Sequence, residues 1–227
     1  MLVKNWMSKK VITVDVNNSL QGAMELIREH NIRMLPVLKR GNLVGILTER
    51  DTKRASASIA TSLEVHKPHP PISKIKVQEI MTKDPIAVPL DYTVEETALI
   101  LLKEKISGAP VVDQEGQVVG IITQSDLFNA LISLTGADQG GIQFGFRVED
   151  RPGSVKEVAD IIRGYGGRML SILSTHDDTA VGYRSVYIRM YDIDRNDLPQ
   201  LIEALSEKIT VLYMIDQRKA KREIYTL

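Results

Sequence analysis

Residues 44–51 read Val-Gly-Ile-Leu-Thr-Glu-Arg-Asp, and residues 119–126 read Val-Gly-Ile-Ile-Thr-Gln-Ser-Asp. The similarity extends outward from these stretches, so that the segment Val3–Asp51 returns as Val77–Asp126 with one additional residue inside a turn. A repeat of this length is typical of one supersecondary unit that is duplicated and packs on its copy. The fold prediction therefore starts from two copies of the same unit.

Each copy is predicted to contain a strand, a helix, a β-hairpin and a second helix. Apolar residues after the first strand recur at the spacing of one helix face, and we expect Asn17, Asn18 or Ser19 to cap this helix. The apolar runs 35–38 and 43–47 flank a polar turn that contains glycine, which predicts the hairpin. This pattern indicates an α/β (α+β) fold.

Breaks in the pattern divide the rest of the chain. After the second copy, glycines end the repeat, and residues 142–215 then follow the order βαββαβ, which predicts a ferredoxin-like domain. One such sheet leaves a face or an edge uncovered, so dimerisation is expected. The predicted parts are a first repeat at 1–60, a Pro-rich linker at 61–75, a second repeat at 76–135, a third domain at 141–217 and a basic tail at 218–227.

Composition narrows the class of protein. The chain has 227 residues, of which 43% are hydrophobic and 26% charged, as is ordinary for a globular protein. It has no cysteine, and no apolar run approaches the roughly 20 residues that cross a bilayer. The N-terminus lacks the apolar core of a signal peptide. We therefore expect a cytoplasmic protein without a membrane segment, a disulfide or a cysteine-ligated metal.

Signatures of catalysis are missing from the sequence. There is no GxGxxG, no GxxxxGK[ST], no GxSxG and no HExxH motif. The four histidines are scattered, and only the weak pair His66 and His69 has a spacing that a metal site uses. The chain is thus predicted to be neither an enzyme nor a metal protein.

The charge is distributed unevenly although it sums to zero. Residues 1–75 contain 12 lysines and arginines against 6 aspartates and glutamates (+6), whereas residues 76–140 contain 4 against 10 (−6). Opposite charge favours docking of the repeats, and the cations of the first suit an anionic ligand. No motif or basic face indicates binding to nucleic acid.

The repeated motifs resemble those of tandem CBS domains, which pair as a Bateman module with a pseudo-twofold axis. The resemblance is carried by the openings MSKKVITV and MTKDPIAV, the strands LPV and APV, and the endings GILTERD and GIITQSD. Members of that family mostly bind adenosine-containing ligands in clefts between the repeats. The resemblance therefore implies a regulatory site for AMP, ADP, ATP or S-adenosylmethionine.

The resemblance also implies which residues form the adenosine site. Asp51 and Asp126 match the aspartates that accept hydrogen bonds from ribose hydroxyls, with Thr48 and Thr123 beside them. Ile12 and Thr13, and in the second repeat Ile86 and Ala87, match the strand that lines the adenine.

Cations for a phosphate occur in the first repeat only. Arg33 matches a position where the family often has a basic phosphate contact, and Arg50 is nearby, whereas the second repeat has Ser107 and Ser125. An arginine binds phosphate through two hydrogen bonds and a serine through one neutral donor. Two pockets of unequal phosphate affinity are expected. The alternative for Arg33 is an exposed cation at a helix end.

The third domain has an entry loop similar to that of ACT domains, which often bind an amino acid there. Asp150, Arg151, Pro152 and Gly153 join a strand to a helix, and Gly166 lies in a later glycine turn. Backbone amides at such a helix start attract a carboxylate. A well-capped turn without a ligand is the alternative, because Arg168 stands where many amino-acid-binding members have asparagine.

The order CBS, CBS, ACT resembles AcuB-type acetoin-utilisation proteins of bacteria. It implies a non-catalytic regulatory protein, a homodimer, that senses an adenosine ligand and acts on a regulated partner in acetoin or related carbon metabolism. The alternative is a ligand-independent structural dimerisation adaptor. The remaining alternative is a third class of function, an enzyme of unrecognised type.

Overall fold

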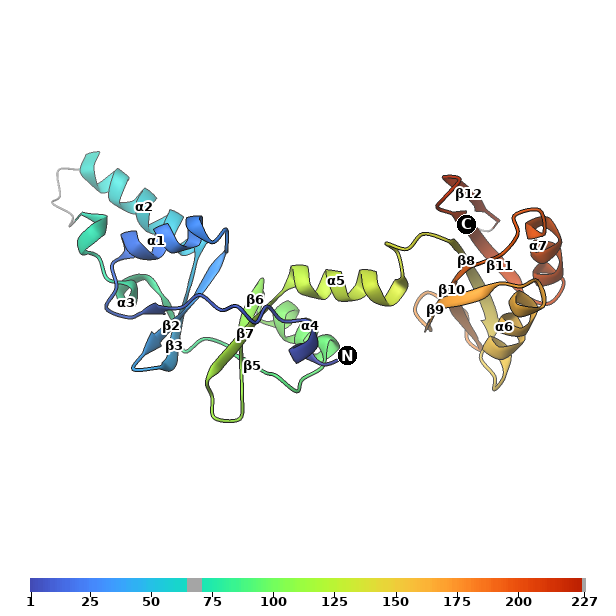
Figure 1. Ribbon diagram of the computed structural model, residues 1–227, viewed down its shortest axis with the longest axis horizontal. Helices are drawn as coiled ribbons and strands as arrows, with labels where there is room; N and C mark the ends of the chain where they lie inside the picture. The colour runs from blue at the N-terminus through green and yellow to red at the C-terminus, as the bar shows by residue number, and fades with distance from the viewer. Residues whose placement is uncertain (65–70, 226–227) are drawn as a thin grey trace. The chain divides into compact units, whose positions relative to one another are not determined.

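The computed structural model describes residues 1–64 and 71–225, and the chain divides into two compact units, Met1–Phe128 and Asn129–Leu227 (Figure 1). The weak pair His66 and His69 and part of the predicted linker lie outside the described residues. The second unit begins earlier than the predicted residue 141.

The first repeat has the predicted order of elements. It contains β1 (Val14–Asp15), α1 (Leu20–Glu29), β2 (Met34–Lys39), β3 (Asn42–Thr48) and α2 (Glu49–Glu64). Of the three expected caps of α1, Ser19 is the one used, because its hydroxyl accepts a hydrogen bond of 3.1 Å from the Gly22 amide.

The second repeat reproduces this order. It contains β5 (Val88–Pro89), α4 (Val94–Lys103), β6 (Gly108–Val112), β7 (Val118–Thr123) and α5 (Gln124–Thr135). Thr93 and Glu96 form a capping box at the start of α4. Both hairpins shift register at the same place, between Val37 and Leu38 in one and between Val111 and Val112 in the other. The repeat seen in the sequence is therefore also a repeat in backbone geometry.

Short elements precede each repeat and pack in the other one. They are η1 (Val3–Asn5), η2 (Ile72–Lys74), α3 (Val77–Ile80) and β4 (Thr82–Lys83). Strand β4 pairs with β3, which gives the sheet order β1-β2-β3-β4, and Ser8 forms an isolated bridge with Ile121 beside the sheet β5-β6-β7.

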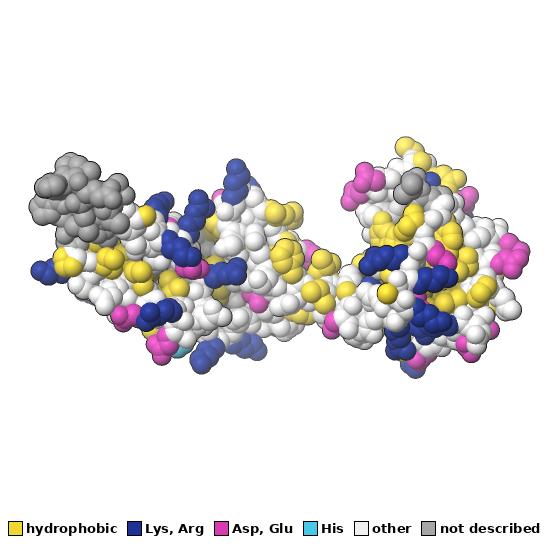
Figure 2. All heavy atoms as spheres, turned by 90° about the horizontal axis from the view of Figure 1, so that it is seen from above, with side chains coloured by type: hydrophobic (Ala, Val, Ile, Leu, Met, Phe, Trp, Pro, Cys, Tyr) yellow, Lys and Arg dark blue, Asp and Glu magenta, His cyan; other side chains and the backbone are white. Residues whose placement is uncertain are grey.

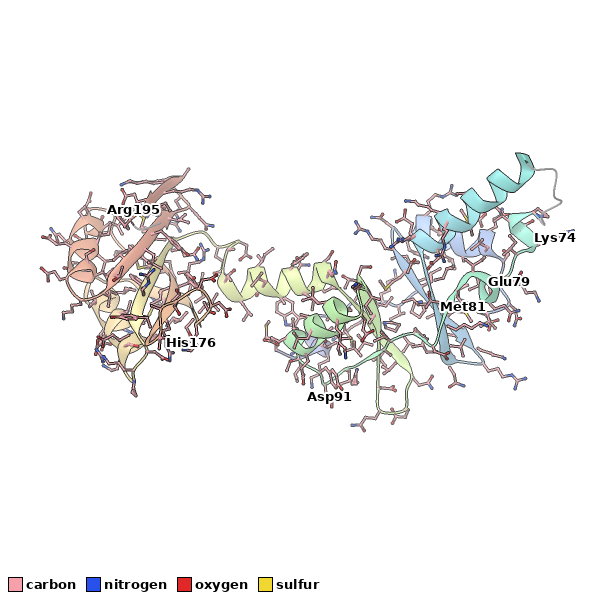
Figure 3. All side chains as sticks on the ribbon, turned by 180° about the vertical axis from the view of Figure 1, so that it is seen from behind. Lys74, Glu79, Met81, Asp91, His176 and Arg195 are labelled. Carbon is pink, nitrogen blue, oxygen red and sulfur yellow. The ribbon has the colours of Figure 1, made fainter. Side chains whose placement is uncertain are left out.

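The cores confirm this reciprocal exchange. Val77 is buried with the first-repeat core, whereas Val3 is buried with the second-repeat core. Met81 lies against Gly45 of β3, and Met7 lies against Gly120 of β7. Figure 3 shows Met81 beside the strands of the first repeat. Each repeat is therefore completed by a segment at the start of the other one.

We expect Gly45→Ala to destabilise the first unit by about 1 to 3 kcal/mol, the usual cost of overpacking a core. A Cβ at Gly45 would lie 2.4 Å from the Met81 sulfur and 3.1 Å from the carbonyl oxygen of Thr82, which is backbone. Urea unfolding of the variant measures the change. Gly22→Ala is the control, because only the Ser19 hydroxyl lies near, at 3.4 Å, and alanine favours the helix. Equal stabilities of the two variants would contradict the exchange.

The second unit contains a five-stranded antiparallel sheet with two helices. Its elements are β8 (Ile142–Glu149), α6 (Ser154–Gly164), β9 (Arg168–Thr175), β10 (Tyr183–Tyr191), α7 (Leu198–Ser206), β11 (Thr210–Asp216) and β12 (Lys221–Ile224). The sheet order is β12-β11-β8-β10-β9. Side chains of α6 and α7 share one core with β8, in which Phe144 and Phe146 stack at 5.6 Å.

The C-terminal segment differs from the predicted tail. Residues 221–224 form β12, which pairs antiparallel with β11 from Tyr213 to Asp216. Its sequence, Lys-Arg-Glu-Ile, gave no strand pattern, and the strand forms because β11 offers a free edge. Residues 226–227 are not described.

The sheet face without helices carries a buried arginine. Arg189 on β10 is 4% exposed, and its guanidinium donates to the carbonyl oxygens of Thr135 and Gly140 and to the side-chain oxygens of Gln217 and Gln143, at 2.8 to 3.3 Å. Burial lowers the pKa of Arg189. These bonds tie the end of α5 to the sheet, which explains why the second unit starts before residue 141.

Candidate functional site

A cleft of about 480 Å³ lies between the two repeats of the first unit. The first repeat contributes Arg33 after α1 and the β3–α2 junction with Thr48, Arg50 and Asp51. The second repeat contributes the segment from Thr82 to Ile86 and the turn after α4: Thr82, Asp84, Pro85, Ile86, Lys105 and Ser107. The cleft thus combines a carboxylate, cations and an apolar wall.

Thr48 fixes the carboxylate of Asp51 through hydrogen bonds. Its Oδ2 accepts hydrogen bonds from the Thr48 amide at 3.0 Å and the Thr48 hydroxyl at 2.6 Å, and the Asp51 amide donates back to that hydroxyl at 3.2 Å. The other oxygen, Oδ1, lies 3.3 Å from the guanidinium of Arg54. Since Oδ2 already has two donors, Oδ1 is the oxygen that is left for a ligand hydroxyl.

The second repeat contains the same arrangement. Oδ2 of Asp126 accepts from the Thr123 amide at 2.8 Å and from its hydroxyl at 2.7 Å. The repeat places Asn129 where the first has Arg54. The two carboxylates are therefore held in the same way. The residue one turn further along the helix differs, because it is Arg54 in the first repeat and Asn129 in the second.

Charges of both signs line the cleft. Arg33, Arg50 and Lys105 supply cations. Glu49 is bound to Lys53 at 2.6 Å, and this bond together with Arg33 lowers the pKa of Glu49. Lys105 was missed from sequence. It corresponds to Asn31 in the repeat, and both residues have positive φ, 55° and 49°, at a helix end.

The structure brings together half of the predicted adenosine-site residues in this cleft. Those that line it are Arg33, Thr48, Arg50, Asp51 and Ile86. Ala87, next to Ile86, is not among the lining residues. The four remaining predicted residues are the repeat equivalents of Ile86, Ala87, Thr48 and Asp51. They are Ile12, Thr13, Thr123 and Asp126. Ile12 packs against the first-repeat core.

A second, smaller cavity of about 370 Å³ lies at the start of α6. Four of the five residues predicted for this loop line it, namely Asp150, Arg151, Pro152 and Gly153. Gly153 has φ 92° and offers no side chain to cap α6, and the Ser154 amide at the start of the helix donates to the Arg151 carbonyl at 3.3 Å. Ser154, 4% exposed, also lines the cavity, and its hydroxyl has no hydrogen bond to the described part of the chain.

Gly166 is the exception among the loop residues. It lies beyond the other end of α6, and a helix of 11 residues is about 16 Å long. Its φ of 79° serves the turn after α6, and Gly166 is not among the residues that line this cavity.

The loop is held by ion pairs. Arg151 binds Glu157 through two hydrogen bonds of 2.8 Å and Glu149 through one of 2.8 Å, and both carboxylates raise the pKa of Arg151. Asp150 accepts from Arg184 and lies 3.0 Å from His176, and the Arg184 guanidinium lowers its pKa. The cations near the cavity are therefore partly neutralised.

Within residues 1–64 and 71–225, no three histidine, aspartate or glutamate side chains gather as a metal site would require. No helix in the described part of the chain has the length and hydrophobicity to cross a membrane.

Comparison with known proteins adds relatives for the first unit. The sequence model of the CBS domain matches residues 3–58 and 77–133. A CBS domain-containing protein of Dictyostelium discoideum is 32% identical over 134 residues, which cover 59% of this chain and 92% of the relative. An inosine-5'-monophosphate dehydrogenase of Korarchaeum cryptofilum is 35% identical over 55% of this chain, but the match spans only 23% of that enzyme.

A solved structure is similar over the same region. The CBS domain pair of protein MJ0100, in complex with 5'-methylthioadenosine and S-adenosyl-L-methionine, is 36% identical, with a TM-score of 0.50. The match covers 58% of this chain and 99% of that one.

Proposed function

Because the chain belongs to the CBS domain family, with two CBS domains in tandem, we propose that it is a non-catalytic regulatory protein that binds an adenosine-containing ligand between them. The observation that carries this proposal is the cleft in which Asp51, whose carboxylate is held by Thr48 through Oδ2, shares one cavity with Ile86 and three cations. A carboxylate suits ribose hydroxyls, and an apolar wall suits a flat base.

The cations indicate which ligands to test first. Arg33, Arg50 and Lys105 suit the phosphates of AMP, ADP or ATP. The similar CBS pair of MJ0100 holds S-adenosyl-L-methionine and 5'-methylthioadenosine, which favours adenosine with a sulfur-containing tail. Both ligand groups share the adenosine that the proposal requires.

The proposal extends to the second unit and to the biological role. We assign to it an ACT-type regulatory domain, in which the start of α6 and the Ser154 hydroxyl suit the carboxylate of an amino acid. The domain order, which resembles that of acetoin-utilisation proteins, supports a role in acetoin or related carbon metabolism. Ligand binding favours one packing of the repeats, and a regulated partner of the homodimer responds to that change.

A ligand panel tests the proposal. We expect at least one of AMP, ADP, ATP or S-adenosylmethionine to raise the melting temperature of the wild-type protein by several degrees, because a ligand at 100 times its Kd stabilises by about 2.7 kcal/mol. The matching guanosine nucleotides are the control for the base. An unchanged melting temperature with all adenosine ligands would instead favour the structural adaptor, whose clefts need no ligand.

A further inference from the structure

Helices α6 and α7 cover one face of the sheet in the second unit and leave the other face open. They share a core with alternate strand residues such as Phe144 and Ile188, so the residues between these lie on the open face. The segment after α5 contacts this face at Arg189. Beside that arginine, the register aligns one residue from each strand across the open face: Leu173, Tyr187, Gly145, Tyr213 and Ile224. We call these five residues the apolar row.

The middle of the apolar row is aromatic. Ring atoms of Tyr213 lie 2.4 to 2.9 Å from the position that a Cβ on Gly145 would take, so the ring lies over this glycine. The ring of Tyr187 is 6.3 Å away and is inclined to it by 22°. Leu173 and Ile224, at the two ends of the row, are 38% and 56% exposed. The row therefore presents a continuous apolar stripe to a partner.

Arginines lie on both sides of the apolar row. Arg147 follows the row by two residues on β8, and Arg222 precedes it by two residues on β12, which runs in the same direction. Both are exposed, and neither forms an ion pair with the part of the chain that the structure describes. The acidic residue of the described strands on this face is Glu149, which Arg151 binds at 2.8 Å. On the second unit in Figure 2, hydrophobic side chains likewise lie next to lysine and arginine side chains.

We propose that the apolar row binds an acidic amphipathic helix of the regulated partner. Neighbouring strands are about 4.8 Å apart, so the row is about 19 Å long, a length that about 13 residues of α-helix span. The apolar stripe of such a helix fits the row, and carboxylates on both sides of the stripe meet Arg147 and Arg222. This inference rests on the regulated partner of the proposed function and is independent of the adenosine ligand.

Two other occupants fit this face less well. A second copy of the same face would bring arginines against arginines, so that like charges meet. Single-stranded nucleic acid is anionic, but Leu173 and Ile224 offer no ring on which a base can stack. Residues 129–227 contain 13 lysines and arginines against 14 aspartates and glutamates (−1), so the second unit as a whole does not attract a polyanion.

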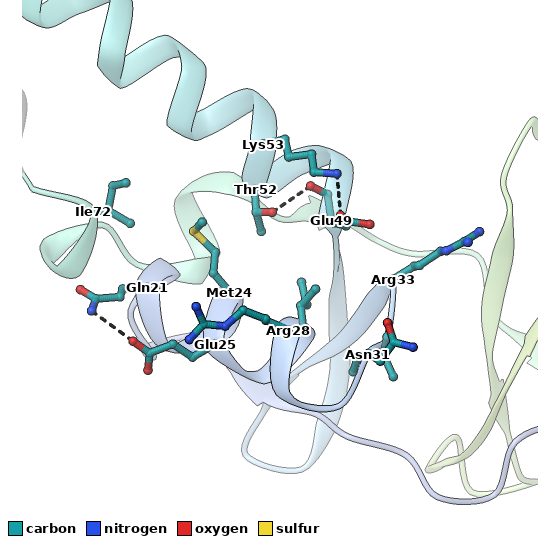
Figure 4. A pocket seen from close by; sticks show the side chains of 12 residues that line it. Gln21, Met24, Glu25, Arg28, Asn31, Arg33, Glu49, Thr52, Lys53 and Ile72 are labelled. Carbon is teal, nitrogen blue, oxygen red and sulfur yellow. Dashed lines mark hydrogen bonds and ion pairs between the residues drawn. The ribbon is translucent and has the colours of Figure 1, made fainter.

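A groove between α1 and α2 of the first unit is another surface with cations (Figure 4). It has a volume of about 740 Å³. Carboxylates belong to its lining, because Glu49 binds Lys53 at 2.6 Å and Glu25 accepts a hydrogen bond from Gln21 at 3.2 Å. An acidic helix would meet these carboxylates in the groove, whereas the arginines beside the apolar row are free to bind it.

Peptide selection on the full chain tests the proposal. The probe is a phage-displayed library of random peptides of about 15 residues, which is long enough for the helix that fits the row. We expect the bound sequences to be enriched in aspartate and glutamate and to repeat leucine, isoleucine or phenylalanine at the spacing of one helix face. The peptide that binds most tightly is then synthesised with a fluorescent label, and fluorescence anisotropy measures its affinity for each variant.

Leu173→Glu and Arg147→Glu are each expected to weaken the binding of this peptide at least tenfold. Ile172→Glu is the matched control for the first variant, because Ile172 is the next residue of β9, is 44% exposed and pairs with Ile188 on the face of α6 and α7. Arg163→Glu on the exposed side of α6 is the control for the second, since it changes the net charge equally. Both controls are expected to bind as the wild type does, and far-UV circular dichroism checks that every variant is folded.

Each other outcome overturns the proposal. The partner helix is excluded if no sequence is enriched, if basic sequences are enriched, or if the Leu173→Glu and Ile172→Glu proteins bind the peptide equally. A dimer in sedimentation velocity that Leu173→Glu breaks and Ile172→Glu leaves intact would place a second copy on the row. Binding of labelled oligouridine that Arg147→Glu abolishes would place nucleic acid there. The melting-temperature shift with an adenosine ligand is expected to be the same in all four variants, so it tests the proposed function separately.

Discussion

Replacing Asp51 by alanine is expected to weaken the binding of the adenosine ligand in the described cleft by at least tenfold. The variant removes Oδ1, the oxygen available to a ribose hydroxyl, and a hydrogen bond to a charged group contributes about 1.5 to 3 kcal/mol. Isothermal titration with the ligand that stabilises the wild type measures the loss. Asp126→Ala probes the corresponding carboxylate of the second repeat in the same way.

The control for this variant comes from the repeat architecture. Asp51 also caps α2, so Asp51→Ala is expected to lose about 1 kcal/mol of stability without any ligand. Glu96→Ala removes the similar capping box of α4, where Thr93 donates to Glu96 at 2.8 and 2.9 Å, and Glu96 does not line the cleft. Equal ligand affinity of the Asp51→Ala and Glu96→Ala proteins would show that Asp51 serves only as a cap.

Arg189→Met is expected to destabilise the second unit by about 3 to 5 kcal/mol. The substitution leaves the carbonyl oxygens of Thr135 and Gly140 and the side-chain oxygens of Gln143 and Gln217 without their donor, and each buried polar group without a partner costs about 1 to 3 kcal/mol. Denaturant unfolding followed by circular dichroism measures the loss.

Arg168→Met is the matched control for Arg189. Arg168 starts the neighbouring strand β9 and is exposed, and its guanidinium lies 3.6 Å from Asp192 and over the ring of Tyr191. We expect a change below about 0.5 to 1 kcal/mol, as is typical of an exposed ion pair. A loss for Arg189→Met no larger than this would mean that water replaces the guanidinium without cost.

The repeat in the sequence predicted the paired elements and the pairs of threonine and aspartate, because both follow from local pattern and from helix capping. It did not predict which repeat each preceding segment completes. Val3 and Val77 are equivalent in sequence, and only packing shows that each is buried in the other repeat. Lys105 was missed for a related reason: it joins Arg33 in the cleft only because two repeats meet there.

Tertiary contacts also explain the other differences between the sequence predictions and the structure. Nothing in the charged sequence of residues 221–224 predicts a strand, and the free edge of β11 provides the hydrogen-bond partners. The resemblance to ACT domains joined Gly166 to the loop before α6, and the length of α6 separates the two. The end of α5 belongs to the second unit, where Arg189, a charged residue within an apolar strand, binds Thr135.

Photolabelling with 8-azido-ATP tests the central claim most directly, since it reports where adenosine binds. Peptide mass spectrometry of the labelled wild-type protein is expected to find the label in residues 82–87, around Ile86, or in the corresponding residues 8–13, and excess unlabelled ATP or S-adenosylmethionine is expected to remove it. Displaceable label that is found only within residues 129–227 would contradict an adenosine site between the CBS repeats. Label that no adenosine ligand displaces would contradict it as well.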